Sequence, residues 1–449
     1  MKVRYINSAT VIIESSNGVK ILTDPWFTDG EYYGAWYNFP PFEFEESFFE
    51  DLDFIYVSHI HPDHFSKKTF QKLSKNIPVL IHLYENKFLK KNIEVLGFKV
   101  IELSHNIRTH LKNNVFINIL AADNCNPKLC GKFFGCGIVE SKFGSTQIDT
   151  ICVIDDITHV VVNTNDCPFE LSKDTLHLVK SQYQKVDLLL VGYGGAGPYP
   201  QCFNLDNEEK QNAASNKCVD FLNIGVKYID ELNPIFVLPF AGTYVLGGKL
   251  SKLQKYRGVP EIEDAASYFE DNSDAKIILL NRYEYFDIPS KTSSKKYIPV
   301  NLEEKQSYIT NVLSKKKLDY ENDENEETYF KKNKNEILNL IFLGYNRFEN
   351  KRIEIGFYSD TSTLIYLTDN LWCEISNKGE GISLIDTLEK IKVMNFVSYR
   401  LDIRLLHRIL KGPKHSHWNN AEIGSHIEFD RCPNDFNRGL YHCMNFFHS

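Results

Sequence analysis

Residues 54–64 read FIYVSHIHPDH, in which an apolar stretch leads directly into a turn with three histidines and one aspartate. Phe, Ile, Tyr and Val favour β-strands, so this turn is expected at the end of a buried strand. His59 and His61 are two residues apart and can converge on one metal ion, while Asp63 and His64 can face a second. Imidazole and carboxylate ligands suit Zn, Fe or Mn, and two such ions can activate a small oxygen species between them. A set of surface-loop histidines is the alternative.

The pattern HxHxDH is the signature of the metallo-β-lactamase superfamily, which this sequence resembles. Residues 7–27, NSATVIIESSNGVKILTDPWF, are similar to the start of the branch that includes ascorbate-lactone hydrolases and phospholipase D-type enzymes. The resemblance implies an α/β fold of the αββα sandwich type. It also implies that Asp24 is a structural residue whose carboxylate hydrogen-bonds the ligand loop. A surface turn at Asp24-Pro25 is the alternative.

The resemblance implies further ligands later in the chain. In HVVVNTNDCPF, residues 159–169, Asp166 matches the bridging carboxylate, with an Asx-turn aspartate as the alternative. An additional histidine is expected before it, but His105, His110 and His159 do not stand at clear strand ends. After the predicted strand NVFINILA comes Asp123, which we take as the candidate replacement ligand.

The last histidine of the superfamily pattern is missing from this sequence. It should follow the predicted strand 235–239, where the chain reads LPFAGTY, and no histidine occurs between His177 and His407. Either the second metal has fewer protein ligands, or a C-terminal residue such as His415 or His417 reaches the site.

The departures from the hydrolase pattern resemble another family. The stretches VNTNDCPF, GYGGAGPYPQCF (192–203) and LPFAGTY (238–244) are similar to the catalytic region of CMP-N-acetylneuraminate hydroxylases, and the similarity spans roughly residues 1–285. That family hydroxylates the N-acetyl group of a nucleotide sugar and carries an N-terminal Rieske domain. Because this sequence holds no Rieske ligand set, the resemblance implies a separate electron-donor protein.

Two polar or glycine-rich stretches are candidates for binding a small-molecule substrate. The loop 192–200 follows a buried strand and can approach a phosphate closely, although a tight turn beside the site explains it equally well. The C-terminal stretch around HSHWNN can form the polar wall of a pocket or an ordinary hydrogen-bonding network. The candidate substrate-binding residues are Gly194, Gly195, Tyr199, Gln201, Tyr244, His417 and Asn419.

Hydrophobic periodicity divides the 449 residues into three parts. Residues 1–285 alternate short apolar stretches with amphipathic ones and predict the α/β catalytic domain, with its longest helix at Glu208–Glu231. Residues 286–336 are dense in charge and predict a solvated helix, linker or insertion. Residues 337–449 regain strand-like alternation and predict a smaller α+β domain.

Composition excludes some classes of function. The formal net charge is −8 and there is no concentrated basic stretch, so nothing indicates nucleic-acid binding. No apolar stretch approaches the roughly 18 residues of a membrane span, and no secretory signal is visible. We therefore expect a cytoplasmic protein whose ten cysteines are thiols.

Two chemistries remain open. In the first, two divalent metal ions, with iron favoured, activate dioxygen and hydroxylate an amide-bearing or nucleotide-sugar substrate. In the second, a metal-bound hydroxide on zinc attacks a lactone, phosphodiester or amide, with Asp63 as the catalytic proton shuttle. A non-catalytic protein with a vestigial site is a third reading, which the intact HxHxDH pattern disfavours. Metal identity discriminates between the first two.

Overall fold

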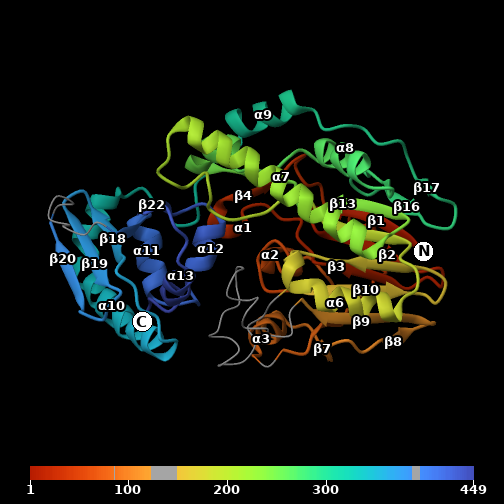
Figure 1. Ribbon diagram of the computed structural model, residues 1–449, viewed down its shortest axis with the longest axis horizontal. Coiled ribbons are helices and arrows are strands. Elements are labelled where there is room, and N and C mark those ends of the chain that lie inside the picture. The colour runs from red at the N-terminus through yellow and green to blue at the C-terminus, as the bar shows by residue number, and fades with distance from the viewer. Residues whose placement is uncertain (85, 123–148, 387–394) are drawn as a thin grey trace.

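The computed structural model describes residues 1–84, 86–122, 149–386 and 395–449. These residues form two lobes, a larger one that contains the N-terminus and a smaller one that contains the C-terminus (Figure 1). The larger lobe is built on two β-sheets with helices on their outer faces, which confirms the predicted αββα sandwich.

The first sheet has eight strands and starts as an antiparallel meander. β1, β2 and β3 pair in that order, and then β3, β5, β6 and β7 run parallel. In spatial order the strands are β17 (Thr292–Ser293), β16 (Tyr285–Asp287), β1 (Lys2–Asn7), β2 (Thr10–Glu14), β3 (Lys20–Thr23), β5 (Phe54–Tyr56), β6 (Val79–His82) and β7 (Val100–Leu103).

The second sheet has seven strands and mixes both directions. β8, β9, β10 and β11 are antiparallel neighbours, and β11, β12, β13 and β15 are parallel. In spatial order they are β15 (Lys276–Ile277), β13 (Phe236–Phe240), β12 (Leu188–Gly192), β11 (Val160–Asn163), β10 (Thr150–Asp155), β9 (Val115–Ala121) and β8 (Thr109–Lys112).

Apolar side chains fill the space between the two sheets. Val11 and Ile21 of the first sheet share one buried cluster with Ile117 and Leu190 of the second. Side chains on the opposite faces of the strands pack under helices, because strand residues alternate in direction. The first sheet is covered by α2 and α3, and the second by α6, α7 and α8.

Eleven helices lie in the part of the chain that the structure describes. They are α1 (Glu31–Gly34), α2 (Lys67–Phe70), α3 (Phe88–Val95), α6 (Phe169–Gln182), α7 (Asn207–Leu232), α8 (Ile262–Asn272), α9 (Leu302–Asn311), α10 (Glu326–Glu354), α11 (Ile403–Leu410), α12 (Trp418–Ile423) and α13 (Arg438–Met444). Short 3₁₀ segments lie at Glu46–Phe48, Gly248–Tyr256 and Leu313–Lys315. Among these helices, none combines the length and apolar character that a membrane span requires.

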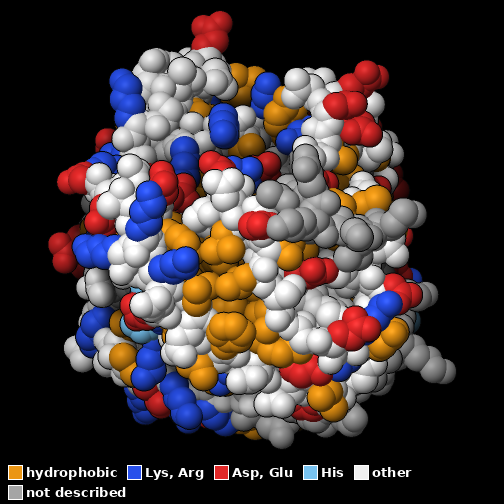
Figure 2. Space-filling view, turned by 90° about the vertical axis from the view of Figure 1, so that its left-hand side faces the viewer, with side chains coloured by type: hydrophobic (Ala, Val, Ile, Leu, Met, Phe, Trp, Pro, Cys, Tyr) orange, Lys and Arg blue, Asp and Glu red, His pale blue; other side chains and the backbone are white. Residues whose placement is uncertain are grey.

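The smaller lobe is a five-stranded sheet packed against α10, α11 and α13. Its strands in spatial order are β20 (Ile382–Ile385), β19 (Leu371–Ser376), β18 (Ser362–Thr368), β21 (Phe396–Arg400) and β22 (Glu428–Cys432). On the outer side of this lobe, hydrophobic side chains gather in the middle of a face that is otherwise rich in charge (Figure 2).

The two lobes share one apolar core. A two-stranded ribbon of β4 (Trp36–Asn38) and β14 (Tyr244–Leu246) lies at their junction. The rings of Trp36 and Tyr244 stack 3.4 Å apart and 5° from parallel. Both residues belong to the same buried cluster as Ile337 and Ile341 of α10, so the smaller lobe is packed directly onto the larger one.

The charged segment 286–336 is more structured than a linker. It contains β17, which extends the first sheet, as well as α9 and the first turns of α10. The predicted helix Glu208–Glu231 corresponds to α7, which is the longest described helix within residues 1–285, as predicted. Helix α10 has 29 residues against 26 in α7.

Candidate metal centre

The candidate ligands lie where strands of the two sheets end. Strands β3 and β5 run parallel, with Thr23 paired with Tyr56, so Asp24 and the loop after β5 start at the same edge. Strand β11 of the facing sheet ends at Asn163, three residues before Asp166. The carboxyl ends of parallel strands are the usual place for a site in α/β folds, because the loops there converge.

One group of donors consists of His59, His61 and Asp149. The His59 Nε2 and His61 Nδ1 atoms are 2.9 Å apart, and the His59 Nδ1 atom lies 3.2 Å from Asp149 Oδ1. One donor atom from each residue lies within 4.8 Å of the others. The predicted convergence of His59 and His61 therefore occurs, and Asp149 is a third donor that sequence reasoning did not identify.

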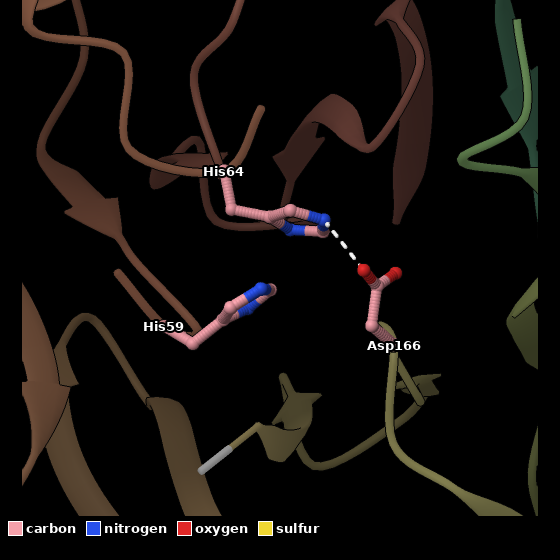
Figure 3. A group of neighbouring side chains, drawn as sticks. All are labelled: His59, His64 and Asp166. Carbon is pink, nitrogen blue, oxygen red and sulfur yellow. Dashed lines mark ion pairs between the residues drawn. The ribbon is translucent and has the colours of Figure 1, made fainter. Parts of the chain in front are cut away.

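A second group consists of His59, His64 and Asp166, whose donor atoms also lie within 4.8 Å of one another. Figure 3 shows the two imidazoles and the carboxylate turned toward a common space. The His64 Nε2 atom is 3.3 Å from Asp166 Oδ2 and 3.6 Å from Asp63 Oδ2. His59 belongs to both groups, so the two candidate sites are adjacent.

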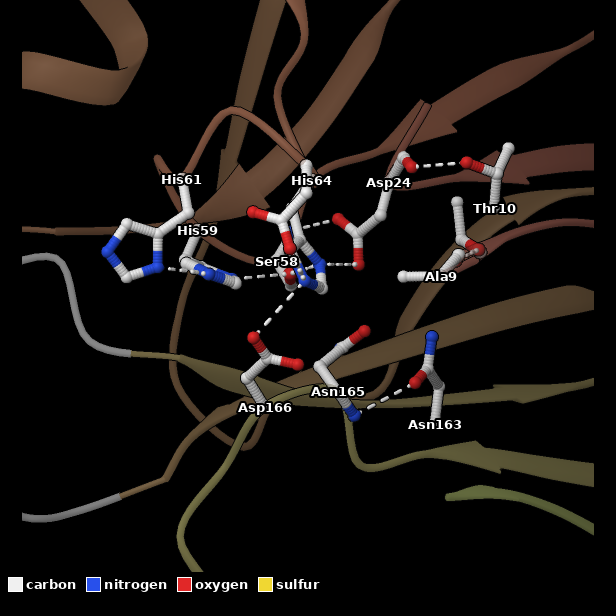
Figure 4. A network of polar contacts seen from close by, with 12 residues as sticks. Ala9, Thr10, Asp24, Ser58, His59, His61, His64, Asn163, Asn165 and Asp166 are labelled. Carbon is white, nitrogen blue, oxygen red and sulfur yellow. Dashed lines mark hydrogen bonds and ion pairs between the residues drawn. The ribbon is translucent and has the colours of Figure 1, made fainter. Parts of the chain in front are cut away.

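Asp24 contacts the ligand loop through both of its carboxylate oxygens. It is fully buried, so the alternative of a surface turn is wrong. Its Oδ1 atom accepts a 2.7 Å hydrogen bond from the Ser58 backbone N–H, and its Oδ2 atom lies 3.1 Å from His64 Nδ1 (Figure 4). A carboxylate that holds one ring nitrogen of a histidine leaves the other nitrogen free to bind a metal. The Ser58 hydroxyl lies 2.9 Å from His59 Nδ1 and thus braces the neighbouring ring.

Burial and nearby charges shift the pKa of His59 downward and the pKa values of His64 and Asp149 upward. Burial, followed by the nearby charges of His64 and His61, holds the pKa of His59 well below its usual range. Burial also lowers the pKa of His64, but the carboxylates of Asp166, Asp63 and Asp24 outweigh it and raise that pKa well above normal. Burial and the Asp166 charge raise the pKa of Asp149 to about 7.

Imidazoles and carboxylates in this arrangement fit a divalent metal. The carboxylates that stabilise the protonated form of His64 would also stabilise a metal cation bound to this histidine instead of the proton. A metal and a proton compete for the same donor atoms. His59, by contrast, is kept neutral by burial, which is the form that ligates a metal.

The histidine that was expected before Asp166 is not supplied by the candidates in that region. His159 lies at the far end of β10, where its Nδ1 atom is 3.4 Å from Asp156, and His110 is on the edge strand β8. The His105 Nδ1 atom instead accepts a hydrogen bond from the Ala121 N–H. Asp123 lies outside the described residues. Asp149 lies close to that position on the adjacent strand, since its carbonyl accepts the Ala122 N–H.

Asn419 of the smaller lobe contacts a candidate metal ligand. The Asn419 Oδ1 atom, at the start of α12, lies 3.0 Å from His61 Nε2. His417 caps the same helix, with its Nδ1 atom accepting the Asn419 N–H, and neither His415 nor His417 joins the donor groups of the described chain. At the place of the missing last histidine, after β13, stands Ala241 in a left-handed conformation with φ 59°.

Tyr32 also contacts the ligand loop, and the sequence pattern had not indicated it. Its hydroxyl donates a 2.5 Å hydrogen bond to Asp63 Oδ1. Tyr32 lies in α1, and both it and Tyr33 have left-handed backbone angles with φ 49° and 58°. Nothing in EYYGAW distinguishes it from the other aromatic residues of this Tyr-rich chain.

The candidate substrate residues lie in different environments. A side chain on Gly194 would meet Val259 at 2.7 Å, and one on Gly195 would meet the Phe221 ring at 1.8 Å, so packing alone requires both glycines. The side chain of Gln201 is buried and donates to the Gly197 carbonyl. Their role in substrate binding stays a prediction.

Tyr199 is partly exposed to solvent, whereas Tyr244 is buried. Tyr199 is 38% exposed and lines a cavity of about 510 Å³ together with Lys217 and Phe221. Tyr244 is buried between Trp36 and the guanidinium of Arg257, which lies 3.7 Å from its ring centre. A role for either residue in substrate binding likewise stays a prediction.

Comparison with known proteins agrees with the fold of the larger lobe. Residues 2–125 match the family model described as a beta-lactamase superfamily domain. A Mycolicibacterium smegmatis protein with the provisional name Rieske 2Fe-2S iron-sulfur protein is 26% identical over 249 residues, which are 54% of this chain and 43% of that protein. The cytidine monophosphate-N-acetylneuraminic acid hydroxylase of Danio rerio is 24% identical over 258 residues, which are 54% of this chain and 38% of that enzyme.

The match thus spans less than half the length of these relatives. Among solved structures, the isothiocyanate hydrolase from Delia radicum gut bacteria aligns with a TM-score of 0.43 at 11% identity. That alignment covers 64% of this chain and 99% of the hydrolase.

Proposed function

We propose that this chain, whose residues 2–125 match a beta-lactamase superfamily domain, is a metal-dependent enzyme with two adjacent divalent metal sites. Its reaction is the hydroxylation of an amide-bearing or nucleotide-sugar small molecule. The first metal is assigned to His59, His61 and Asp149, and the second to His64 and Asp166, with His59 shared between the two groups. Asp63 is added to the second site because its Oδ2 atom lies 3.6 Å from His64 Nε2.

The composition of the first donor group carries the proposal. Two histidines and one carboxylate on one side of an ion, with open positions opposite, form the ligand set typical of non-haem iron oxygenases. A hydrolytic zinc site of this fold class would be expected to hold a third histidine, as the sequence analysis set out. Here the third described donor is the Asp149 carboxylate. Iron bound in such a set would supply dioxygen activation.

The protein's own residues hold and orient the ligands. Asp24 fixes the His64 ring by its Nδ1 atom, which leaves Nε2 directed at Asp63 and Asp166. Tyr32 occupies one oxygen of Asp63 by hydrogen bonding and leaves the other turned toward His64. The ligands are therefore held before the metals bind, which lowers the cost of ordering them.

Such a reaction needs electrons as well as a substrate. We propose that they come from a separate electron-donor protein, a proposal supported by the Rieske name of the mycobacterial relative. The substrate class is supported by the name of the hydroxylase relative.

Hydrolysis by a metal-bound hydroxide is the second candidate. The observation that favours it is the position of Asp63, whose Oδ2 atom lies 3.6 Å from His64 Nε2 and whose side chain is 12% exposed. A carboxylate there can relay a proton between a metal-bound water and a leaving group. This alternative calls for zinc and for an ester, lactone or amide substrate.

Metal analysis under anaerobic conditions tests the proposal. The protein is purified without oxygen, its metal content is measured, and its optical spectrum is recorded before and after air is admitted. About two irons per chain and a spectrum that changes on exposure to air are expected. Zinc in place of iron, with no response to air, would reject the oxygenase and leave hydrolysis.

A further inference from the structure

We propose that the smaller lobe orients the metal ligands, with Asn419 fixing His61 and with Tyr32, itself held by His426, fixing Asp63. The inference rests on the proposed metal centre but assigns it outer partners that lie far away in sequence. Asn419 and His61 are separated by 358 positions, and His426 and Tyr32 by 394.

The contact between Asn419 and His61 decides which ring nitrogen can bind a metal. The amide oxygen of Asn419 can only accept a hydrogen bond, so at 3.0 Å the His61 Nε2 atom must carry the hydrogen. The His61 Nδ1 atom then keeps its lone pair and faces His59 Nε2 at 2.9 Å. A divalent metal held by His59 and His61 would therefore find both lone pairs available.

Asn419 is itself held firmly. It is the second residue of α12, and its backbone N–H donates to the His417 ring. The preceding Trp418 is fully buried, and its indole N–H donates to the Phe447 carbonyl at 2.9 Å. The position of the Asn419 amide is therefore fixed by the core of the smaller lobe and not by the ligand loop.

The contact between Tyr32 and Asp63 depends on the strained backbone of Tyr32 and Tyr33. The left-handed conformations of Tyr32 and Tyr33 cost free energy that their surroundings must offset. The His426 Nε2–H donates to the Tyr32 carbonyl at 2.7 Å, and the His417 backbone N–H donates to the Tyr33 hydroxyl at 2.6 Å. Both donors belong to the smaller lobe, so its docking maintains the conformation from which Tyr32 reaches Asp63.

His426 suits this role because it stays neutral. Burial lowers its pKa to about 4, and the Tyr320 hydroxyl lies 3.0 Å from its Nδ1 atom. With Nε2–H donated to a carbonyl, the Nδ1 atom is left to accept from Tyr320. The ring is thereby locked between two partners.

Two substitutions separate the two contacts. Asn419→Ala removes the acceptor for His61, whereas Asn419→Asp keeps an oxygen in the same place. Tyr32→Phe removes only the hydroxyl that binds Asp63. Asn346→Ala is the matched control, because Asn346 is exposed on α10 of the same lobe.

The readout is the affinity for cobalt(II), measured by chelator competition, together with the visible spectrum of the bound cobalt. Loss of an outer partner of a metal ligand costs roughly 10–100-fold in affinity. We expect His61→Ala to abolish binding of the first ion and Asp63→Ala to abolish binding of the second. Asn419→Ala should weaken binding of the first ion, and Tyr32→Phe should weaken binding of the second. Asn419→Asp should bind cobalt within about threefold of the unmodified protein, and Asn346→Ala should match it.

The outcomes distinguish this inference from the proposed function. If the unmodified protein binds no metal, the proposed function fails. If it binds two ions and Asn419→Ala and Tyr32→Phe bind them equally well, the orienting role is wrong. Equal loss in Asn419→Ala and Asn419→Asp, with unchanged melting temperatures, would also overturn it, because the aspartate supplies the acceptor.

Discussion

Replacement of Asp24 should separate protein stability from metal binding. Asp24 is fully buried and uses one oxygen for the Ser58 N–H at 2.7 Å and the other for His64 Nδ1 at 3.1 Å. Asp24→Ala leaves both partners buried without an acceptor. Breaking a buried pair in this way costs about 3–5 kcal/mol of unfolding free energy.

Asp24→Asn should leave the fold nearly intact and still impair the second metal site. Its amide oxygen can keep the Ser58 N–H, so the loss of stability should be only about 1 kcal/mol. Its amide hydrogens then face His64 Nδ1 and force that nitrogen to accept. The hydrogen moves to Nε2, which is the nitrogen turned toward Asp63 and Asp166. Affinity for the second metal should fall roughly 10–100-fold, or about 1.4–2.7 kcal/mol.

Urea unfolding and metal titration of the two variants test this reasoning. Asp53→Asn is the control, because Asp53 also accepts a backbone N–H, from Lys20 at 3.0 Å, but lies outside the donor groups. If Asp24→Asn binds both metals as tightly as the unmodified protein and Asp53→Asn, then Asp24 does not set the form of the His64 ring. If Asp24→Ala has the same free energy of unfolding as the unmodified protein, the buried contacts of Asp24 do not stabilise the fold.

Three further predictions concern single positions. Asp149→Ala should lower the metal content from two ions to one while Asp123→Ala leaves it at two; elemental analysis that gives the reverse would return the ligand role to Asp123. Burial raises the pKa of Glu422 to about 8 from 4.5, so as pH rises above 4.5 the unfolded state ionises first and the folded state loses relative stability. Glu422→Gln should therefore stabilise the protein by about 1–3 kcal/mol at pH 7.5 relative to its effect at pH 4.5, and a difference that does not depend on pH in urea unfolding would contradict this. Gly195→Ala should cost about 1–3 kcal/mol because its added methyl group meets the Phe221 ring, and Phe221→Leu should relieve part of that cost in a double-mutant cycle.

The sequence predicted the parts of the site that lie within one strand and its turn. The spacing of His59, His61 and His64 after an apolar strand determines where their rings can point, because a strand end leaves few arrangements. Asp166 joins the donor group of His59 and His64, and it lies three residues after the end of a strand. Asp24 could be placed from a family resemblance, and its burial accounts for the role.

Other parts of the site depend on contacts between residues far apart in the sequence, which the local sequence pattern does not predict. Asp149 directly precedes β10, and only the antiparallel pairing of β9 with β10 brings it to the position where a histidine was sought. Asn419 and Tyr32 act through a junction between lobes, and a pairing over more than 350 positions leaves no trace in spacing.

The first turns of α10 lie in the charged segment 286–336, where apolar residues are sparse. In α10 the buried positions include Phe330, Ile337, Ile341, Gly344 and Phe348, which recur at intervals of three, four or seven residues. That stripe is enough to hold a helix against the lobe. The dense lysines and glutamates between these positions belong to the solvent face, and they led to the expectation of a solvated helix, linker or insertion.

The metal centre itself is tested most directly by crystals of the iron-loaded protein, grown without oxygen and measured at the iron absorption edge. The account predicts two anomalous peaks, one among His59, His61 and Asp149 and one among Asp63, His64 and Asp166. A single peak, or two peaks with Asp149 outside bonding distance of both, would contradict it.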